Sequence, residues 1–333
     1  MTPIKFQAYR VFETDNGSFE RRIVERSTAE LPEGDLLIKV HYAGLNYKDA
    51  LSAYGNKGVT RVYPHTPGID ASGEVVESHS PDIVPGAKVI VTGYDLGMNA
   101  DGGFGEYICV PASWVVPLPD KLSLRTSMQY GTAGFTAALS VHKLLNASQK
   151  PESGPVLVTG AAGGVGSMSV LILKKLGFKV IAGTSSLTDS KETVDKLGAD
   201  DHYDSSMLND TSGRPLIRAR WAGAIDCVGG NVLATALKAC SAGGNVITCG
   251  NIYSQELPIT VYPFILNEVS LLGVASQNTD MGLRRVIWQK LANEWQVDAG
   301  TLTREITLPE LDKALELFIS KKNRGRVLLR HGS

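Results

Sequence analysis

The sequence is poor in cysteine, with four cysteines among 333 residues. They stand far apart along the chain, and none forms a C-x-x-C pair: Cys109, Cys227, Cys240 and Cys249. A zinc knuckle needs closely spaced ligands, and a disulfide framework is typical of much shorter secreted chains. The sequence therefore argues against both, and we expect four small side chains in or near the core.

Long apolar runs and an excess of one charge are also missing. No run of about 18 apolar residues, the length of a membrane span, occurs, and the first residues lack the apolar stretch of a signal peptide. The 33 basic and 34 acidic residues leave a formal charge of -1, which gives no electrostatic footprint for nucleic acid or an anionic membrane. We expect a cytoplasmic protein that binds neither. The six histidines show no metal spacing. None has a Ser or Cys partner that the sequence identifies, so a catalytic triad is unsupported as well.

Glycine, in contrast, is abundant. It accounts for 35 of 333 residues, about a tenth, where the usual share is ~7%. Many tight turns and close backbone approaches are typical of nucleotide-binding α/β proteins. At roughly 100 to 200 residues per domain, the length predicts two domains.

The first third of the chain predicts a small, strongly bent β domain. Short apolar runs follow Pro-Gly or Pro-Glu-Gly turns, and we expect strands at Leu36–Val40, Gly73–Val76 and Lys88–Val91. A helix is predicted from Ser127 to Leu145, interrupted by Gly131 and Gly134.

The middle of the chain alternates strands and helices. We expect strands at Val156–Thr159, Lys179–Ala182, Ala224–Val228, Asn245–Cys249 and Ser270–Ala275, and helices at Val165–Leu176, Ser190–Leu197 and Val232–Cys240. This alternation predicts a doubly wound parallel sheet of six strands, hence an α/β fold. The tail predicts a helix from about Asp280, a helix that begins near Leu308 and ends at Ile319, and a strand at Arg326–Leu329.

A glycine-rich turn joins the first strand of this sheet to its helix. The segment from Thr159 to Ser167 fits the dinucleotide fingerprint, with Ala161 in place of the first glycine and Gly163 and Gly166 at the required offsets. Its backbone N–H groups and the helix N-terminus would bind a pyrophosphate. A turn that binds nothing is the weaker interpretation in this context.

The end of the second strand indicates which dinucleotide is bound. An acidic residue there would favour NAD, but Thr184-Ser185-Ser186-Leu187 contains none before Asp189, so NADP is favoured. Ser185 and Ser186 could donate to a 2′-phosphate, and Lys191 could add charge. The alternative is that the serines cap a turn and Lys191 is a solvated helix charge.

Five separated motifs resemble the medium-chain dehydrogenase/reductase superfamily: 45–50 (LNYKDA), 67–70 (PGID), 131–137 (GTAGFTA), 221–226 (WAGAID) and 263–266 (PFIL). Within it the chain is most similar to the zinc-free quinone oxidoreductase-like members, in the group of acryloyl-CoA reductases and quinone oxidoreductases. The resemblance implies a GroES-like substrate domain at 1–126, a Rossmann NADP-binding domain at 127–276 and a C-terminal return at 277–333. Zinc-dependent members have a Cys and a Gly-His-Glu where this chain has Tyr47 and Ile69-Asp70, so the resemblance implies no metal site.

The resemblance also implies roles for single residues. Tyr47 matches a tyrosine beside the nicotinamide, and Ala162, Gly163, Gly164 and Val165 match the pyrophosphate loop. The nicotinamide half is expected to be lined by Asn251, Ser276 and Thr136, while Asn323 and Arg326 lie in a tail segment that reaches back over the cofactor. Close relatives often have a basic residue where this chain has Leu187, which weakens the preference for NADP.

Without a metal, NADPH can deliver hydride to a double bond conjugated to a carbonyl. Tyr47 is the candidate donor to the enolate, since a neutral phenol can protonate it; packing against the cofactor is the equal alternative. Residues 45–49 are expected to form a loop, which Asn46, with Asp49, would orient, and Lys48 either steers an acyl-CoA or is a solvated charge.

The favoured function is therefore NADPH-dependent reduction of an activated alkene, of the acryloyl-CoA type. NADPH:quinone reduction is the alternative enzyme, and a non-catalytic NADPH-binding sensor is the alternative from another class. We also expect a homodimer, because the apolar strand at Ser270–Ala275 would end the sheet, although the tail of the same chain could cover that edge instead.

Overall fold

The structure is a computed structural model that describes residues 2–332, except for the side chain of Leu187. The chain forms two compact units. Unit 1 comprises Met1–Thr132, Gln277–Ala292 and Thr303–Ser333, and unit 2 comprises Ala133–Ser276 and Asn293–Leu302. The segment after residue 276, expected as a return to the first domain, thus contributes to both units.

Unit 2 contains a six-stranded, wholly parallel sheet in the order β10-β9-β8-β11-β12-β13. The strands are β8 (Val156–Thr159), β9 (Val180–Gly183), β10 (Asp201–Tyr203), β11 (Trp221–Asp226), β12 (Cys240–Thr248) and β13 (Ser270–Gly273). The strand order reverses between β8 and β11, and the carboxyl ends of strands at such a switch point are where doubly wound sheets bind ligands.

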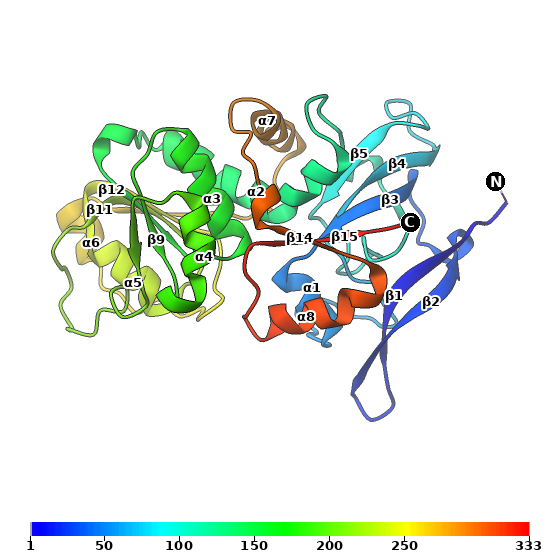
Figure 1. Ribbon diagram of the computed structural model, residues 1–333, viewed down its shortest axis with the longest axis horizontal. Coiled ribbons are helices and arrows are strands. Elements are labelled where there is room, and N and C mark those ends of the chain that lie inside the picture. The colour runs from blue at the N-terminus through cyan, green and yellow to red at the C-terminus, as the bar shows by residue number, and fades with distance from the viewer. Residues whose placement is uncertain (1, 333) are drawn as a thin grey trace. The chain divides into compact units, whose positions relative to one another are not determined.

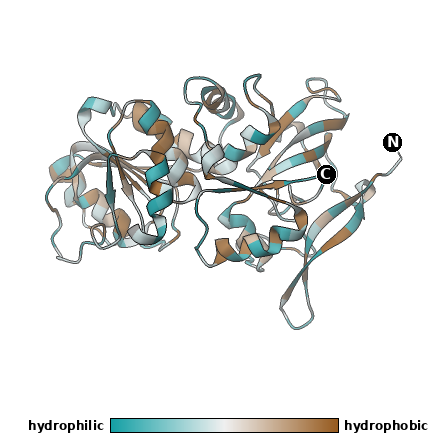
Figure 2. Ribbon diagram, viewed as in Figure 1, coloured by the Kyte–Doolittle hydropathy of each residue, from teal (hydrophilic) through white to brown (hydrophobic). Residues whose placement is uncertain are grey.

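Helices cover both faces of this sheet, with α3 and α4 on one face and α5 and α6 on the other (Figure 1). They are α3 (Gly164–Lys175), α4 (Leu187–Leu197), α5 (Gly230–Lys238) and α6 (Tyr262–Asn267). β8 and β11 are buried along their whole length, as parallel strands between two helix layers must be. The helices are amphipathic, and hydrophobic and hydrophilic residues alternate along them in Figure 2.

Unit 1 is built on a bent, mainly antiparallel sheet in the order β14-β15-β3-β4-β5-β7, with β6 paired to β3. Its strands are β3 (Leu36–Gly44), β4 (Asp70–Ser78), β5 (Lys88–Thr92), β6 (Tyr107–Val110), β7 (Val115–Pro117), β14 (Thr303–Ile306) and β15 (Arg326–Arg330). A separate antiparallel hairpin consists of β1 (Lys5–Glu13) and β2 (Phe19–Ser27). The helices are α1 (Tyr47–Ala53), α7 (Met281–Ala292) and α8 (Leu311–Ile319), and the helical run α2 (Leu124–Asn146) begins in this unit and continues into unit 2.

The α2 run is bent at Gly131, as the glycine interruption predicts. Gly131 has φ 51° and ψ -154°, a left-handed backbone that joins two helices across a kink. An added Cβ there would meet Asp70 Oδ2 at 2.3 Å. The kink therefore places the start of the second helix directly over the Asp70 carboxylate.

The α/β fold is confirmed, with corrections of detail. The sequence predicts six strands but names five, because it misses β10, a strand of three residues. It also treats residues 45–49 as a loop, whereas Tyr47 to Ala53 form α1. Among the described residues no helix has both the length and the apolar character needed to cross a bilayer.

Candidate functional site

The glycine turn lies at the carboxyl end of β8, next to the switch point of the unit 2 sheet. Gly160 has φ 64°, and its carbonyl accepts from Gly163 N at 2.9 Å, which closes the turn. A Cβ on Gly166 would meet Gly160 O at 2.2 Å, so only glycine lets the helix approach the turn this closely. The predicted fingerprint thus folds as a close-packed strand–turn–helix.

The first turn of α3 has backbone donors to offer. Gly163 is the N-cap, and the first intrahelical hydrogen bond runs from Ser167 N to Gly163 O at 2.9 Å. The amides of Gly164, Val165 and Gly166 have no intrahelical acceptor, since the first N–H groups of any helix lack one. The turn fits a bound pyrophosphate because these amides and the positive end of a 12-residue helix point the same way.

Hydroxyl groups gather where β9 ends. Ser185 is exposed, whereas Ser186 is the N-cap of α4 and accepts from Asp189 N at 3.2 Å. The buried hydroxyls of Thr184 and Ser190 have no hydrogen-bond partner in the described part of the chain. Buried polar atoms are normally satisfied, so this corner fits a further acceptor such as a phosphate. The sequence analysis misses these two hydroxyls, because only burial without a partner singles them out.

Lys191 and Leu187 lie on α4. The Lys191 ammonium pairs with Asp195 one turn later at 3.2 Å, and its side chain is 75% exposed. In this structure Lys191 is therefore the solvated helix charge named as the alternative. Leu187 begins the helix, but its side chain lies outside the described part of the structure.

Two residues predicted to line the nicotinamide half meet within unit 2. Thr136 Oγ1 donates to Ser276 Oγ at 2.8 Å, and Thr136 is buried. They lie 140 positions apart, so their contact supports the placement of both on one surface. Asn251 is exposed on the loop after β12.

In unit 1 the segment from Asn46 to Asp49 forms the start of α1. Asn46 is the N-cap, and its N–H donates to Asp49 Oδ2 at 2.7 Å, while Ile69 N donates to Asp49 Oδ1 at 2.8 Å. Burial, and then the charge of Asp70, raise the pKa of Asp49 to about 7. Tyr47 packs against the core, and within residues 2–332 its hydroxyl makes no hydrogen bond. Asp49 thus fixes the helix start that displays Tyr47.

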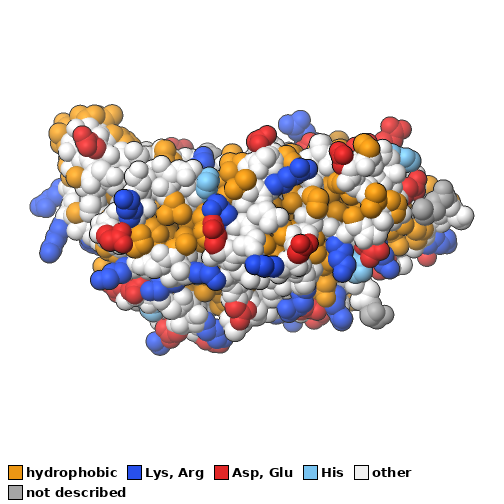
Figure 3. All heavy atoms as spheres, turned by 90° about the horizontal axis from the view of Figure 1, so that it is seen from above, with side chains coloured by type: hydrophobic (Ala, Val, Ile, Leu, Met, Phe, Trp, Pro, Cys, Tyr) orange, Lys and Arg blue, Asp and Glu red, His pale blue; other side chains and the backbone are white. Residues whose placement is uncertain are grey.

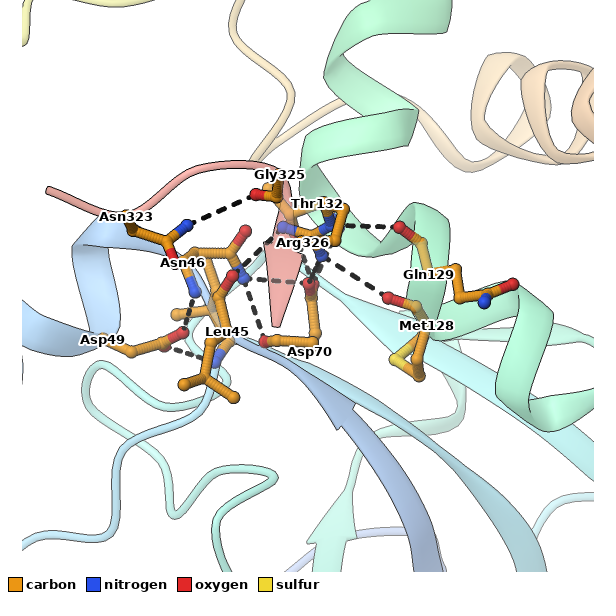
Figure 4. Close-up of polar contacts among 12 residues, drawn as sticks. Leu45, Asn46, Asp49, Asp70, Met128, Gln129, Thr132, Asn323, Gly325 and Arg326 are labelled. Atoms are coloured by element: carbon orange, nitrogen blue, oxygen red, sulfur yellow. Dashed lines mark hydrogen bonds and ion pairs between the residues drawn. The ribbon is translucent and has the colours of Figure 1, made fainter. Parts of the chain in front are cut away.

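Asp70 is the centre of the polar cluster in Figure 4. Its carboxylate accepts from Asn46 Nδ2 at 2.9 Å, from Thr132 N at 2.9 and 3.0 Å and from Thr132 Oγ1 at 2.6 Å. The Arg326 guanidinium lies 3.9 Å away. Burial raises the pKa of Asp70, while the charge of Arg326 opposes that shift. The sequence places Asp70 only where zinc-dependent members have a ligand, and the structure makes it a buried junction between β4, α1 and α2.

Arg326, expected to reach over the cofactor, lies instead in the interior of unit 1. It is 2% exposed, and its donors bind the carbonyls of Gln129 at 2.9 Å, Leu45 at 3.0 Å and Met128 at 3.4 Å. A guanidinium held this way positions the Leu45 turn and the α2 kink (Figure 4). Asn323 lies three residues earlier, half-buried, with its amide on Gly325 O at 3.3 Å.

Lys48 is not the solvated charge that the sequence left as one alternative. It is half-buried, and its ammonium donates to Gln277 Oε1 at 2.8 Å. Burial lowers its pKa. A lysine in the first turn of a helix opposes the helix dipole, and perturbed lysines of this kind are concentrated at functional sites.

A structural test of the zinc site expected in related dehydrogenases gives a poor fit. Zinc takes about four N, S or O ligands in a tetrahedron. Tyr47 and Ile69-Asp70 occupy the corresponding positions, and both oxygens of Asp70 are already bound by Asn46 and Thr132. No group of three or more His, Cys, Asp or Glu side chains in residues 2–332 could hold a metal ion.

Comparison with protein families finds two matches. Residues 32–120 match the alcohol dehydrogenase GroES-like domain, and residues 164–293 match the family named zinc-binding dehydrogenase. The first match lies within unit 1. The second covers part of unit 2 and also α7, which belongs to unit 1.

Similar proteins extend over almost the whole chain. A Bacillus subtilis protein named "Putative quinone oxidoreductase YhfP" is 43% identical over 91% of this chain and 92% of its own. Acrylyl-CoA reductase AcuI of Ruegeria pomeroyi is 38% identical over 95% and 96%. Among solved structures, the yhdH oxidoreductase of Salmonella enterica in complex with NADP has a TM-score of 0.94 at 38% identity, covering 98% of this chain and 100% of that one. Bacillus subtilis protein yhfP with NAD bound has a TM-score of 0.95 at 41% identity, covering 98% and 99%.

Proposed function

Because the chain belongs to the zinc-free, quinone oxidoreductase-like group of the medium-chain dehydrogenase/reductase superfamily, we propose that it reduces carbon–carbon double bonds conjugated to a carbonyl, with NADPH and in the manner of an acryloyl-CoA reductase. The proposal rests on one observation above all: the first turn of α1 carries two donor groups, the Tyr47 hydroxyl, which makes no hydrogen bond within residues 2–332, and the half-buried ammonium of Lys48. Both are donors suited to the oxygen of an enolate.

NADPH, when bound, supplies the hydride. Unit 2 would hold its pyrophosphate on the amides of Ala162, Gly164, Val165 and Gly166, while Gly163, whose own amide donates to Gly160 O, closes the turn around it. The 2′-phosphate would be held by Ser185 and Ser186, helped by the unpartnered hydroxyls of Thr184 and Ser190. Lys191 would join only if it left Asp195.

The remaining contacts of the coenzyme follow from the placement of single residues. Thr136, Ser276 and Asn251 would line the nicotinamide half in unit 2, and the Thr136–Ser276 hydrogen bond supports this. Asn323 would contribute from the tail. For Arg326 we propose a positioning role through the Leu45 carbonyl in place of direct contact.

In the chemical step Tyr47 would donate to the substrate carbonyl as negative charge develops, and the proton would then pass to the α-carbon. Asn46 and Asp49 would position Tyr47 through the N-cap hydrogen bond of 2.7 Å. Lys48 would stabilise the same negative charge, and its lowered pKa brings its proton nearer to release.

Stopped-flow oxidation of NADPH with acryloyl-CoA and with a simple quinone tests the proposal. We expect the larger kcat/KM for acryloyl-CoA, and a drop in hydride transfer on the order of 10²-fold in Tyr47→Phe. A larger value for the quinone would instead favour NADPH:quinone reduction, which the similarity to YhfP supports. NADPH binding without turnover of either acceptor would favour a non-catalytic sensor.

We further propose that unit 2 mediates a homodimer of a cytoplasmic protein. β13 ends the sheet and pairs with β12 alone in the described residues. Close to it in sequence, Val261, Tyr262, Ile265 and Leu266 are exposed. Figure 3 shows hydrophobic side chains exposed at the left end and both signs of charge interspersed over that face. A monomer by light scattering at micromolar concentration would contradict the dimer.

We propose that residues 1–126 form the substrate domain and residues 127–276 the coenzyme-binding domain. Residues 277–333 would be the segment that returns to the substrate domain. Comparing coenzyme affinity of point variants in each range would test this division.

A further inference from the structure

Two of the four cysteines come together at the carboxyl ends of β11 and β12, one strand away from the switch point of the unit 2 sheet. Cys227 directly follows β11, and Cys249 directly follows β12. The preceding residues, Asp226 and Thr248, are register partners of these parallel strands. The Cys227 and Cys249 sulfurs lie 3.7 Å apart, although 22 residues separate them in the chain.

This arrangement satisfies the backbone requirement for a disulfide. Neighbouring strands lie about 4.8 Å apart, and bridged cysteines have Cα atoms about 4.4 to 6.8 Å apart. From 3.7 Å the sulfurs need to approach by about 1.7 Å to reach bonding distance. Both cysteines are free and only partly buried.

The hydrogen bonds make the two thiols unequal. Cys249 Sγ donates to Asp226 O at 3.3 Å, which leaves its sulfur lone pairs to accept from the Cys227 thiol. That hydrogen bond, together with burial, raises the pKa of Cys227. The raised pKa keeps the Cys227 thiol protonated and makes it a poor first nucleophile, so Cys249 attacks first.

We propose that Cys227 and Cys249 are an oxidisable pair that a hydroperoxide converts reversibly to a disulfide. Cys249 thiolate attacks the terminal peroxide oxygen, the O–O bond breaks, and Cys249 becomes a sulfenic acid. Cys227 then attacks the Cys249 sulfur, the S–S bond forms, and water leaves. With hydrogen peroxide, two thiols lose two protons and two electrons, and the peroxide is reduced to two water molecules.

The disulfide would act on the coenzyme turn, and this consequence rests on the proposed function. Cys227 N donates to Thr159 Oγ1 at 3.1 Å, and Thr159 immediately precedes Gly160 of the turn. An added Cβ on Gly160 would lie 3.5 Å from Cys227 Cβ, and one on Gly250 would lie 2.7 Å from Cys227 O. Drawing Cys227 towards Cys249 therefore shifts backbone packed against both the turn and the Asn251 loop.

The test exposes the full-length protein to hydrogen peroxide, blocks free thiols with N-ethylmaleimide and analyses unreduced peptides by mass spectrometry. We expect a Cys227–Cys249 linked peptide, two fewer alkylated thiols than in the untreated chain, and reversal by dithiothreitol. Cys227→Ser and Cys249→Ser should each abolish the linked peptide, whereas the matched variant Cys109→Ser should retain it. Four alkylatable thiols after treatment, or a Cys249 sulfinic acid without a linked peptide, would overturn the proposal.

A titration separates this proposal from the proposed function. We expect the reduced protein to bind NADPH and the oxidised protein to bind it on the order of tenfold more weakly, with Cys227→Ser insensitive to peroxide. Equal affinities of the two forms would overturn the coupling to the coenzyme while leaving the reductase assignment intact. A reduced protein that binds no NADPH would instead contradict the proposed function, and the linked peptide would still decide the disulfide.

Discussion

The side-chain amide of Asn46 donates to Asp70 Oδ2 over 2.9 Å. Through this contact one buried carboxylate joins the N-cap of α1 to β4, and Thr132 ties the same carboxylate to the helix that follows the Gly131 kink. Two carboxylates thus fix the segment that carries Tyr47: Asp70 through the Asn46 side chain and Asp49 through the Asn46 backbone.

Replacing Asp70 by Asn should destabilise unit 1 strongly. The substitution removes the only carboxylate within ion-pair distance of the buried Arg326 guanidinium among residues 2–332 and replaces one acceptor oxygen by a donor. Leaving a buried charge without its partner costs about 3 kcal/mol or more. Urea unfolding measures this, with Asp195→Asn as the control because the Lys191–Asp195 pair is exposed and worth little. Equal midpoints for the two variants would refute the role of Asp70.

Gly131→Ala should disrupt the kink rather than merely stiffen the helix. The added Cβ would meet Asp70 Oδ2 at 2.3 Å, on top of the left-handed backbone that costs a non-glycine residue about 1–3 kcal/mol. Gly177→Ala is the matched control, since Gly177 has φ 84° but nothing within 4 Å of an added Cβ. We expect a larger drop in melting temperature for Gly131→Ala, and similar drops would show that the carboxylate contact contributes nothing.

The stability of unit 1 should fall as the pH rises from about 4 to about 7. The pKa of Asp49 is raised to about 7, above its ordinary 3.8, so in this window the folded state holds a proton that the unfolded chain has lost. By linkage the free energy of unfolding decreases by up to about 1.4 kcal/mol per pH unit, and the change ends above the folded pKa. Urea midpoints across this range should be flatter in Asp49→Asn than in the wild type. Parallel curves for the two proteins would exclude Asp49 as the source.

Lys48→Met should lower turnover more than it raises KM. Methionine retains an apolar stem, so the packing around the half-buried chain changes little, while the ammonium is lost. If Lys48 stabilises developing negative charge, kcat falls on the order of 10²-fold. If it only steers an anionic acyl-CoA, KM rises and kcat stays unchanged. Lys5→Met, at an exposed lysine on β1, controls for loss of surface charge.

Gly166→Ala should abolish coenzyme binding while the chain remains folded. Its Cβ would meet Gly160 O at 2.2 Å, so the turn has to open and the first-turn amides of α3 lose their common direction. Gly177→Ala, just beyond the other end of the same helix, should bind normally. Isothermal titration with NADPH measures both. Wild-type affinity in Gly166→Ala would mean that the turn does not hold the pyrophosphate.

Local sequence pattern was sufficient to predict the α/β fold, because buried parallel strands and amphipathic helices leave a periodic signal. The same holds for the turn around Gly163 and for the kink at Gly131. Local pattern was insufficient where segments far apart in the chain determine the surroundings of a side chain. The burial of Arg326 depends on carbonyls some 200 to 280 positions away, such as Gln129 and Leu45.

Three further features could not be predicted from local sequence pattern. Cys227 and Cys249 meet only because β11 and β12 are neighbours in register, and a count of spacings along the chain cannot show it. The short strand β10 has too few residues for a periodic signal. The role of Lys48 was undecided because only burial separates a solvated lysine from a functional one.

The position of β15 has a consequence for biosynthesis. This strand comes from residues 326–330, yet it lies between β14 and β3 in the sheet that begins near residue 36. On the ribosome, where segments nearer the N-terminus emerge first, unit 2 is complete by residue 302, whereas unit 1 lacks an inner strand until residues 326–330 have emerged. Until then the end of β3 from Tyr42 to Gly44 lacks its partner strand, and nascent chains stalled before residue 326 should contain a folded unit 2 and an incomplete unit 1.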